Sequence, residues 1–547
     1  MIVRKKNNSI QITFKFDFAL VNFVKTLEGR TYQPSTKSWF IPLAGAMPAL
    51  EKLAAKGFDI DPELVKEVMA DDEDRKKTEN LSELDDTEFK TSLPLFPYQK
   101  VGAAFLYKIG SGLLGDEMGL GKTIQSLAVC ERAGARKILI FCPAAVKWQW
   151  AEEIKKFLGS GVMVLVIEGN KLSRDEKWEL INYKGAPIFF IVNYELLLRD
   201  FEKINKDEWD IIIADEATRI SNPQAKQSKK IKKLRAKRRI AMTGTPVSNR
   251  ADEIWNIIDF TNPGVFGNYY SFLNRYCLKN QWGGIFGYQY MDELRDKLKR
   301  YMIRRLKKDV LPELPPRIVA DVPFELTAEE SALYKKIRKE ILFEIEHKDI
   351  AKMKTPMTIQ YTLVKMLRLR QLADSMELLG HNTQSSKLIV LKELLNEALQ
   401  DNVKAIIFTQ FSEMADILER ELSEWNPLKI SGKITEKYQD VVDKFNNVED
   451  YKILIMTSAG QFGLNIQRAS VLFHYDQEWS LAKMEQRAGR AHRIGQKESV
   501  MEYNLLALGT VDYYVKKILH AKARLSGEIL GDAPINMEQI QEILKYE

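Results

Sequence analysis

One nine-residue segment has the composition of a loop that surrounds an anion. It contains Gly115, Asp116, Glu117, Met118, Gly119, Leu120, Gly121, Lys122 and Thr123, and the next residues have helical spacing. Glycines allow backbone N–H groups to surround phosphate oxygens, where larger side chains would obstruct them. We predict that residues 116–123 bind a nucleotide, with Lys122 on the β- and γ-phosphates and the Thr123 hydroxyl on Mg²⁺. Asp116 stands where a P-loop usually has glycine, and a chance glycine-rich loop is the alternative.

An acidic pair supplies the second half of this predicted site. The run Ile211-Ile212-Ile213-Ala214 leads directly into Asp215-Glu216. Carboxylates at the end of a buried strand are costly unless they serve a metal ion or a reacting water. We predict that Asp215 belongs to the Mg²⁺ site and that Glu216 is catalytic, because it orients and deprotonates the attacking water. A nucleotide with β- and γ-phosphates and Mg²⁺ are therefore expected to bind here.

Short apolar runs separated by helical patterns predict the elements that carry these residues. Such runs are typical of buried parallel strands, and they fall into two groups, at about residues 110–245 and 400–480. They are Ile138–Phe141, Val164–Ile167, Ile188–Val192 and Ile211–Ile213 in the first group, and Ile406–Phe408, Ile453–Met456 and Val471–Phe473 in the second. The expected fold class is α/β, with two parallel-sheet lobes, helical insertions between them and a small α+β domain at the N-terminus.

The N-terminal region has its own pattern. Alternation of Ile10, Ile12, Phe14, Phe16 and Phe18 with polar residues predicts a half-buried strand. Further predictions are a helix over Leu20–Leu27, a strand over Lys37–Ile41 and a helix over Leu50–Ala55 that ends at Gly57. Residues 61–90 are acidic and poor in apolar residues, which predicts a linker.

Composition limits the class of protein. The chain has 547 residues, 45% of them apolar and 29% charged, and its three cysteines are far apart. No apolar run approaches the roughly 20 residues that cross a bilayer, and the N-terminus lacks the apolar stretch of a secretory signal. We therefore expect a soluble, intracellular, multidomain protein without a membrane partner or a structural metal.

The charge distribution favours a polyanionic partner. The net charge is +7, and residues 61–88 hold twelve acidic and four basic side chains, which leaves +15 on the rest of the chain. Nine of the fourteen residues over 226–239 are Lys or Arg, as are eight of the fourteen over 295–308. We interpret both clusters as helices with one apolar and one charged face, which either bind a duplex backbone or are simply solvated.

Further motifs follow in a fixed order. They are Asp215-Glu216-Ala217-Thr218, Thr243-Gly244-Thr245-Pro246, Phe408-Thr409-Gln410-Phe411, residues 457–467, and the run Gln486-Arg487-Ala488-Gly489-Arg490-Ala491-His492-Arg493. Upstream lies Phe96-Pro97-Tyr98-Gln99, and residues 301–317 stand between the two groups of strands. From about Leu93 to Lys522, this ordered set resembles the superfamily-two helicases, specifically the SWI/SNF-type DNA translocases.

The resemblance implies two RecA-like lobes with ATP between them. It implies that Gln99 reads the adenine, that Arg490 and Arg493 are catalytic arginine fingers, and that Thr243, Thr245, Gly463 and Gln486 couple ATP to DNA. The implied partner is double-stranded DNA, contacted by Lys147, Trp148, Asn193, Tyr194, Gln410 and Thr457. Trp148 in the core is the alternative. Thr218, Ser458 and Gln461 depart from residues that are common in the family, at positions that bear on coupling and on the grip on DNA.

The N-terminal region resembles the HARP domain of annealing helicases more loosely. The matching features are Gly29-Arg30-x-Tyr32, Lys37-x-Trp39 and Gly57-Phe58-Asp59-Ile60. This resemblance implies recognition of forked or branched DNA, with Arg30 and Lys37 as candidate contacts. An unrelated small α/β cap is the alternative.

The predicted organisation is a HARP-like domain over residues 1–60, a linker over 61–90, an ATP-binding lobe over 91–265, insertions over 266–385, a second lobe over 386–525 and a tail over 526–547. The expected function is ATP-dependent translocation along double-stranded DNA, with remodelling or rewinding of forks. The alternatives are a translocase that displaces DNA-bound protein and a nucleotide-gated DNA-binding module that does not hydrolyse ATP.

Overall fold

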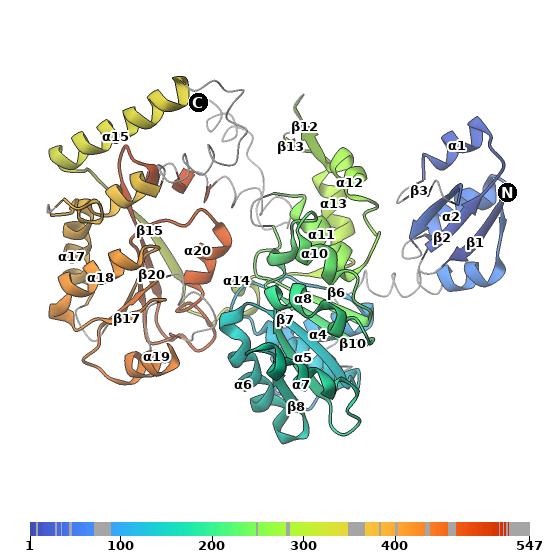
Figure 1. Ribbon diagram of the computed structural model, residues 1–547, viewed down its shortest axis with the longest axis horizontal. Helices are drawn as coiled ribbons and strands as arrows, with labels where there is room; N and C mark the ends of the chain where they lie inside the picture. Colours follow the sequence, from blue (N-terminus) through green and yellow to red (C-terminus); the bar gives the residue numbers. More distant parts are fainter. Residues whose placement is uncertain are drawn as a thin grey trace. The chain divides into compact units, whose positions relative to one another are not determined.

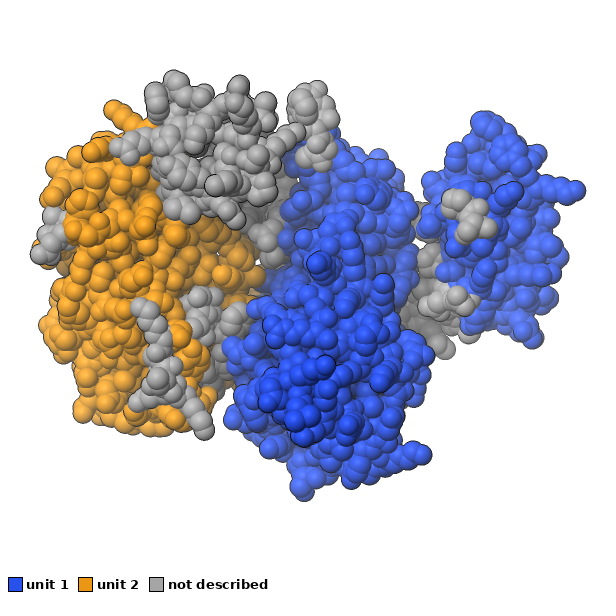
Figure 2. Space-filling model, in the orientation of Figure 1, with its two compact units in different colours: residues 1–306, 524–547 blue, residues 307–523 orange. Residues whose placement is uncertain are grey.

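The computed structural model describes most of the chain in two compact units. It describes residues 1–6, 9–27, 30–33, 36–42, 46–69, 89–247, 250–280, 285–347, 367–381, 384–399, 403–432, 438–457, 466–513, 515–517, 519, 520 and 523. The described part of the first unit ends at Leu306, and the second unit begins at Lys307 (Figure 2). Within these described ranges, no helix combines the length and the apolar character needed to cross a membrane.

The first unit contains a small N-terminal α+β domain (Figure 1). Its mixed sheet has the order β3-β4-β2-β1-β5, in which only the β1–β5 pair is parallel. The strands are β1 (Ile2–Lys6), β2 (Ser9–Thr13), β3 (Thr31–Gln33), β4 (Ser38–Pro42) and β5 (Asp59–Ile60), and the helices are α1 (Phe18–Val24) and α2 (Met47–Ala55). The sheet and the helices enclose one apolar core that includes Val3, Ile10 and Leu53.

Two sequence predictions for this domain are wrong in part. Strand β2 ends at Thr13, and Phe16 and Phe18 are 85% and 72% exposed. The alternation fails there because Asp17 caps α1, with its side chain accepting a hydrogen bond from Leu20 N at 2.9 Å. The domain also continues past residue 60, because residues 62–69 are helical and place Leu64 and Val68 in its core. The predicted linker therefore begins too early.

The second part of the first unit is built on a seven-stranded sheet. Its order is β14-β6-β11-β10-β7-β9-β8, and every pair is parallel. The strands are β6 (Gly112–Leu114), β7 (Lys137–Cys142), β8 (Met163–Val166), β9 (Ile188–Asn193), β10 (Trp209–Asp215), β11 (Ala236–Met242) and β14 (Met302–Ile303). The four apolar runs predicted as strands in this region are confirmed.

Helices surround this sheet and extend the unit (Figure 1). They are α4 (Pro97–Ile109), α5 (Lys122–Arg132), α6 (Lys147–Leu158), α7 (Lys171–Glu179), α8 (Tyr194–Arg199), α9 (Phe201–Ile204), α10 (Lys226–Ile231), α11 (Glu253–Thr261), α12 (Tyr269–Tyr276) and α13 (Met291–Leu298). A hairpin of β12 (Cys277–Lys279) and β13 (Ile285–Tyr288) lies between α12 and α13 in the chain.

The second unit holds a six-stranded sheet that is also parallel throughout. Its order is β15-β20-β19-β16-β18-β17. The strands are β15 (Arg317–Phe324), β16 (Ala405–Phe408), β17 (Leu428–Ile430), β18 (Ile453–Met456), β19 (Val471–His474) and β20 (Val500–Ala507). The helices include α14 (Lys307–Val310), α15 (Ala328–His347), α17 (Ser386–Ala398), α18 (Ser412–Glu421), α19 (Tyr438–Asn447) and α20 (Leu481–Ala488). Three predicted strands are confirmed here, and the α/β fold class with two parallel-sheet lobes is confirmed.

The lobes take residues from the segment predicted as insertions. Strand β14 pairs with β6 in the first sheet, and β15 pairs with β20 in the second. The segment over residues 266–385 therefore contributes an edge strand to each of the two sheets. Both strands lie at a sheet edge, so each pairs with only one neighbour, and such pairing leaves little signal in the sequence.

The two basic clusters are not the single helices that were predicted. The first consists of α10 followed by the strand β11, and the second runs from the end of α13 through β14 into α14. The apolar residues in these clusters serve both sheet and helix packing, so a charged helix face does not extend along either one.

Candidate functional site

The predicted phosphate loop joins β6 to α5. Gly119 and Gly121 have φ angles of +86° and +74°, a region that favours glycine. Helix α5 begins at Lys122, so the half-buried residues Lys122 and Thr123 form its first turn. The Lys122 ammonium donates to the carbonyl oxygens of Asp116 at 2.9 Å and Glu117 at 3.3 Å. Burial lowers the pKa of Lys122, while the nearby carboxylates oppose that shift.

Helix α4 supports the loop through Gln99. The Gln99 side chain is buried, and its Nε2 donates to Leu120 O at 3.1 Å while its Oε1 accepts from Phe96 N at 3.0 Å. A Cβ at Gly121 would lie 2.4 Å from Gln99 Nε2, which explains the glycine at this position. Tyr98 also donates to Leu120 O, at 3.2 Å, and burial raises the pKa of Tyr98 to about 12. The reading of an adenine by Gln99 stays a prediction.

Asp116 lies in the predicted nucleotide-binding loop, but its side chain is bonded within the protein. Its carboxylate is fully buried and forms an ion pair with Arg305, whose Nε donates to Oδ1 at 2.9 Å. Gln125 Nε2 donates to the other oxygen, Oδ2, at 3.0 Å. A paired, buried carboxylate is not available to a phosphate, which it would in any case repel. Asp116 therefore supports the loop from within the protein rather than binding the nucleotide through its side chain.

The acidic pair lies at the carboxyl end of β10. The Asp215 side chain accepts from Trp150 Nε1 at 2.8 Å and from Glu216 N at 3.0 Å, and Asp215 O accepts from the Tyr194 hydroxyl at 2.7 Å. Burial raises the pKa of Asp215, against the hydrogen bond from Trp150 and the charge of Lys122. Glu216 has a φ of +50°, which turns the chain sharply away from the strand.

The Thr243–Thr245 turn contacts the same loop. It follows β11, and Thr243 N donates to Leu114 O at 3.2 Å, next to the start of the loop. A Cβ at Gly244 would lie 2.5 Å from Met118 Cγ and 3.6 Å from Lys122 Nζ. Thr243 and Thr245 are both buried, and Thr245 N donates to Thr243 Oγ1 at 3.2 Å. A coupling role for these threonines is compatible with their position and stays a prediction.

The structure thus brings three predicted motifs to one edge of one sheet. The loop at residues 115–121 follows β6, Asp215 ends β10, and the turn at Thr243 follows β11, in a sheet where these strands are adjacent and parallel. The carboxyl ends of parallel strands are where α/β proteins bind ligands. A cationic lysine, backbone N–H groups at a helix start and two carboxylates suit a Mg²⁺–nucleotide and a reacting water.

The predicted site residues of the second unit are characterised by their burial and their contacts inside that unit. Gln486 is buried on α20, and Arg490 and Arg493 are half-buried just after that helix. Gln410 donates to Gln477 O at 2.9 Å and accepts from Arg370 at 2.9 Å. Thr457 is buried at the end of β18. Gly463, Ser458 and Gln461 lie outside the described residues.

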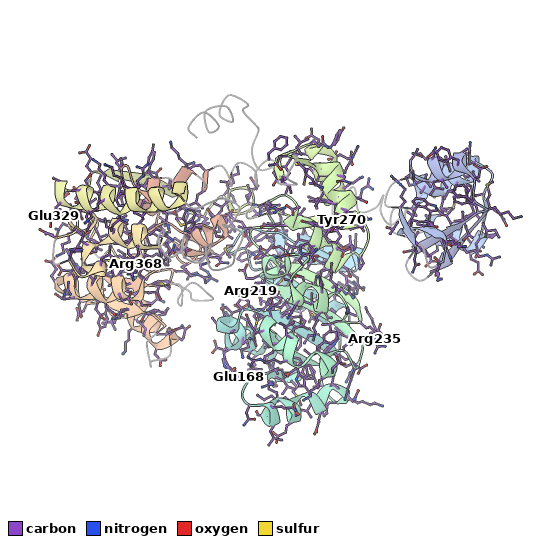
Figure 3. The ribbon with its side chains drawn as sticks, turned by 45° about the horizontal axis from the view of Figure 1, so that its top comes forward. Glu168, Arg219, Arg235, Tyr270, Glu329 and Arg368 are labelled. Carbon is purple, nitrogen blue, oxygen red and sulfur yellow. The ribbon has the colours of Figure 1, made fainter. Side chains whose placement is uncertain are left out.

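Among the predicted DNA contacts of the first unit, one side chain is exposed and three are hydrogen-bonded to other residues of the protein. Trp148 is 58% exposed, which excludes the alternative that it is a core residue. Tyr194 is fully buried under Asp215, so a direct contact with DNA is wrong for this residue. Lys147 is buried and bonded to Glu168 at 2.8 Å, and Asn193 is half-buried and bonded to Glu195 at 2.7 Å (Glu168 is labelled in Figure 3).

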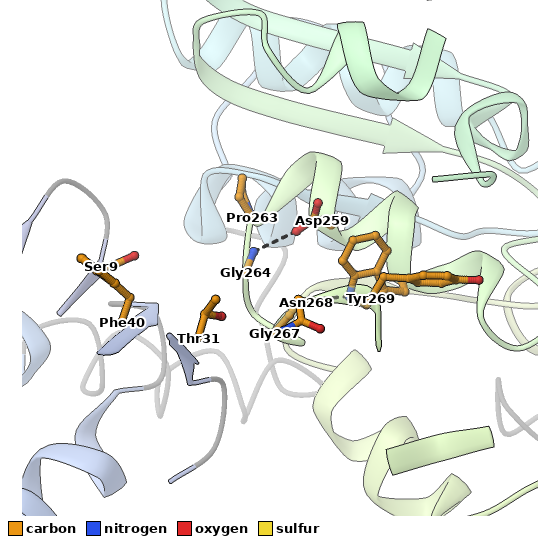
Figure 4. A pocket seen from close by; sticks show the side chains of 10 residues that line it. Ser9, Thr31, Phe40, Asp259, Pro263, Gly264, Gly267, Asn268 and Tyr269 are labelled. Atoms are coloured by element: carbon orange, nitrogen blue, oxygen red, sulfur yellow. Dashed lines mark hydrogen bonds between the residues drawn. The ribbon is translucent and has the colours of Figure 1, made fainter. Parts of the chain in front are cut away.

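Several basic side chains of the first cluster, over residues 226–239, form hydrogen bonds to other residues of the protein. Lys232 donates to Asn256 and Asp259, both at 2.8 Å, and Asp259 Oδ1 also accepts from Gly264 N at 3.0 Å (Figure 4). Arg235, labelled in Figure 3, donates to Lys206 O at 3.0 Å, and Arg239 donates to Phe260 O at 3.0 Å. These contacts favour the interpretation as structural and solvated side chains over a continuous DNA-binding face.

In the N-terminal domain, the two predicted DNA contacts, Arg30 and Lys37, differ in their exposure to solvent. Arg30 is half-buried and donates to Leu27 O at 2.6 Å. Lys37 is exposed, with a φ of +47°, in the turn before β4. Gly29 lies outside the described residues.

Sequence reasoning missed two residues of the site. Trp150, only 3% exposed, orients Asp215, whereas the resemblance pointed to Trp148 by its place in the motif. The i, i+3, i+4 and i+7 spacing of the buried residues Lys147, Trp150, Ala151 and Ile154 on α6 would have indicated that Trp150 faces inward. Arg305, which pairs with Asp116, had no local signal because its partner is 189 positions away.

Two family models match consecutive parts of the chain. The family model for an SNF2-related domain matches residues 67–378, and that for the helicase conserved C-terminal domain matches residues 386–495. The chain is 31% identical over 459 residues to the putative ATP-dependent helicase/translocase YwqA of Bacillus subtilis, covering 80% of this chain and 49% of that protein. It is 28% identical over 521 residues to the DNA repair and recombination protein RAD26 of Saccharomyces cerevisiae, covering 80% of this chain and 47% of that protein.

A solved structure is also similar. The Sulfolobus solfataricus SWI2/SNF2 ATPase core in complex with dsDNA is 30% identical, with 83% of this chain and 97% of that chain covered and a TM-score of 0.38. The chain spans between 41% and 49% of the length of the first three curated relatives that it matches.

Proposed function

The chain belongs to the SNF2-related family and carries a helicase conserved C-terminal domain, and we propose that it hydrolyses ATP to move along double-stranded DNA. The observation that carries this proposal is the convergence of the phosphate loop, the Asp215-Glu216 pair and the Thr243–Thr245 turn at one edge of a parallel sheet. Membership of the family supports the same activity.

In the proposed reaction, the first unit binds the nucleotide and activates the attacking water. Lys122 holds the β- and γ-phosphates, and backbone N–H groups at the start of α5 hold phosphate oxygens. Thr123 and Asp215 would hold Mg²⁺, which neutralises phosphate charge when bound. The fit is supported by Asp215, a desolvated carboxylate that accepts hydrogen bonds from two neutral donors, Trp150 Nε1 and Glu216 N. Glu216 takes the proton from the attacking water.

The second unit would complete the reaction. Arg490 and Arg493 would stabilise the charge that develops on the γ-phosphate, an effect worth about 10³-fold or more in rate for an arginine finger. Gln486, Thr243 and Thr245, with Gly463, would transmit nucleotide state to the DNA-binding surface. Contact with DNA would run through phosphates, with the exposed Trp148 on the first unit and Gln410 and Thr457 on the second.

The N-terminal domain would recognise forked or branched DNA, as the HARP domain does in annealing helicases. Two observations support this assignment. Residues 1–69 carry a net charge of +3, and the exposed Phe16 and Phe18 follow Lys15, with Phe16 on the connection between β2 and α1 and Phe18 at the start of α1. Exposed aromatic rings next to a lysine suit the stacking of unpaired bases, which contributes about 1–3 kcal/mol per base.

The central experiment measures phosphate release by the full chain with no DNA, single-stranded DNA, linear duplex and forked duplex. Duplex and fork are expected to raise the ATPase rate well above the rate without DNA. A rate that does not respond to duplex would overturn the proposal. A rate that responds only to single strands would instead favour a strand-tracking enzyme, and tight DNA binding that ATP modulates without turnover would favour a nucleotide-gated binding module.

Removal of the N-terminal domain is expected to lower the fork-stimulated rate more than the duplex-stimulated rate. The deletion should end at residue 69, because Leu64 and Val68 belong to the core of this domain. Full-length chain with Phe16→Ala and Phe18→Ala should show the same selective loss, and Phe286→Ala, an exposed phenylalanine on β13, is the matched control. Equal losses on fork and duplex would contradict the assignment.

A further inference from the structure

The segment Tyr301–Arg305 continues the sheet alongside the phosphate loop. Leu113 N donates to Tyr301 O at 2.8 Å, Gly115 N to Ile303 O at 2.8 Å, and Glu117 N to Arg305 O at 3.0 Å. The regular spacing of these bonds extends the β6–β14 pairing beyond the end of β6 and into the loop. The first half of the loop is therefore held by a segment that is nearly two hundred residues further along the chain.

The Arg305 side chain holds the same loop from inside the protein. Its guanidinium forms a two-pronged ion pair with Asp116, with Nε 2.9 Å from Oδ1, and it also donates to Gln125 Oε1 at 2.8 Å and to Tyr98 O. The Arg305 side chain is 13% exposed and the Asp116 side chain 0%. Planar guanidinium–carboxylate pairs of this kind combine strong attraction with a fixed geometry. Arg305 thus joins α4, the loop and α5 at one point.

Gly102 provides the space for this junction. It lies in the interior of α4, where glycine is normally less favourable than alanine. A Cβ at Gly102 would come within 2.1 Å of Gln125 Oε1 and 2.3 Å of Arg305 Nη2. A glycine at this helical position is therefore explained by the close approach of Arg305 and Gln125, not by a turn or a cap.

We propose that Arg305 is a positioning residue for ATP hydrolysis. Paired with Asp116, which stands where P-loops usually have glycine, it holds the loop at residues 115–121 in its phosphate-binding shape. It also fastens that loop to the point where the chain leaves the first unit. The proposal rests on the proposed ATPase function and adds to it a residue that supports the loop without contacting the nucleotide.

Arg305 lies close in the chain to the start of the second unit. Lys307, two residues later, begins the second unit. The preceding residue, Arg304, donates to Gly115 O at 2.8 Å and to Gly244 O at 3.1 Å, in the turn predicted to couple ATP to DNA. Two adjacent arginines just before the start of the second unit therefore contact both the phosphate loop and the Thr243–Thr245 turn.

The first test compares Arg305→Gln, Arg305→Lys and Asp116→Asn with Arg132→Gln, an exposed arginine at the end of α5. Each of the first three is expected to weaken binding of a fluorescent ATP analogue and to lower kcat/KM for ATP, by about 10²-fold for Arg305→Gln, since small misplacements of binding groups have effects of that size. Affinity for duplex DNA without nucleotide should stay unchanged.

The double variant Asp116→Asn with Arg305→Gln separates positioning from general damage. Single changes leave a buried charge without its partner, whereas the double change leaves two neutral groups that can still bond to each other. The double variant is therefore expected to bind the ATP analogue at least as well as the weaker single variant. Losses that multiply in the double variant would overturn the proposal, as would wild-type analogue binding by Arg305→Gln.

Gly102→Ala tests the same junction without altering a charge. Alanine favours the helix, yet the added methyl group would press on Arg305 and Gln125, so analogue affinity should fall at least as far as in Arg305→Lys. Gly161→Ala, where a Cβ would meet nothing within 4 Å, is the control. Wild-type analogue affinity in Gly102→Ala would contradict the proposed junction.

Analogue binding is measured without DNA, so it separates this proposal from the proposed function. If DNA fails to stimulate the wild-type ATPase, the translocase proposal fails, while the analogue affinities still decide the role of Arg305. If all the variants lower only the midpoint of thermal unfolding and leave analogue affinity and kcat/KM unchanged, Arg305 is structural and the positioning role is wrong.

Discussion

Lys122→Ala is expected to lower DNA-stimulated ATP hydrolysis by about 10²–10³-fold or more, the usual effect of removing one preorganised donor from a developing anion. Lys122 begins α5 at the end of the phosphate loop, with its ammonium resting on the carbonyl oxygens of Asp116 and Glu117. A nucleotide phosphate would replace these weak acceptors with a full negative charge. Alanine removes that attraction and leaves the glycine-containing loop in place.

The measurement is phosphate release over a range of ATP concentrations with saturating duplex DNA, together with DNA affinity in the absence of nucleotide. DNA affinity should be largely retained, because Lys122 belongs to the loop and not to the exposed surface. Lys206→Ala is the matched control, since Lys206 is an exposed lysine before the amino end of β10, at the opposite edge of the sheet. Turnover that persists in Lys122→Ala would show that this loop is not the ATP site.

Glu216→Gln is expected to reduce turnover by about 10²–10⁴-fold, the range of a general base, while ATP still binds. Glutamine keeps the size of glutamate and its ability to accept a hydrogen bond, but it cannot take a proton from water. Glu216 follows the last residue of β10, in a left-handed conformation that directs the chain away from the sheet. Its neighbour Asp215 is held by Trp150 and Tyr194, so the substitution should not disturb the strand end.

Single-turnover ATP hydrolysis and binding of the ATP analogue provide the readout. Analogue affinity near that of the wild type with slow hydrolysis would support the role of a base, because binding and the chemical step would then be separated. Glu208→Gln, an exposed glutamate just before β10, is the control. Intact turnover in Glu216→Gln would exclude Glu216 as the base and reopen the possibility that another carboxylate activates the water.

Local patterns predicted the central strands well. Runs such as Ile211–Ile213 and Ile453–Met456 are apolar at consecutive positions, because a strand inside a parallel sheet is covered on both faces. Strands β6 and β14 have only three and two residues and lack such a run, so they were not predicted. In the N-terminal domain, alternation at Phe16 and Phe18 suggested a strand, but the cap at Asp17 starts a helix there.

Burial was harder to predict for the aromatic residues near the site. Trp148 and Trp150 are two positions apart on α6, so the helix turns one outward and the other toward Asp215. Tyr194 was selected as a DNA contact from its place in the motif, whereas its hydroxyl is bonded to the backbone of Asp215 inside the protein. Motif position identifies the edge of the sheet at which a residue lies, but not the direction in which its side chain points.

The amino-acid sequence by itself determined the residue types and their order: the glycines and lysine of the phosphate loop, the acidic pair after a buried run, and the apolar strands on which they stand. These depend on residues within a few positions of one another, so they can be recognised without the fold. The tertiary structure alone decided which distant segments meet, such as Arg305 with Asp116, Trp150 with Asp215, and Gly244 with Met118. The reason is that parallel strands become neighbours in an order different from their order in the chain, and the contacts of their loops follow from that arrangement.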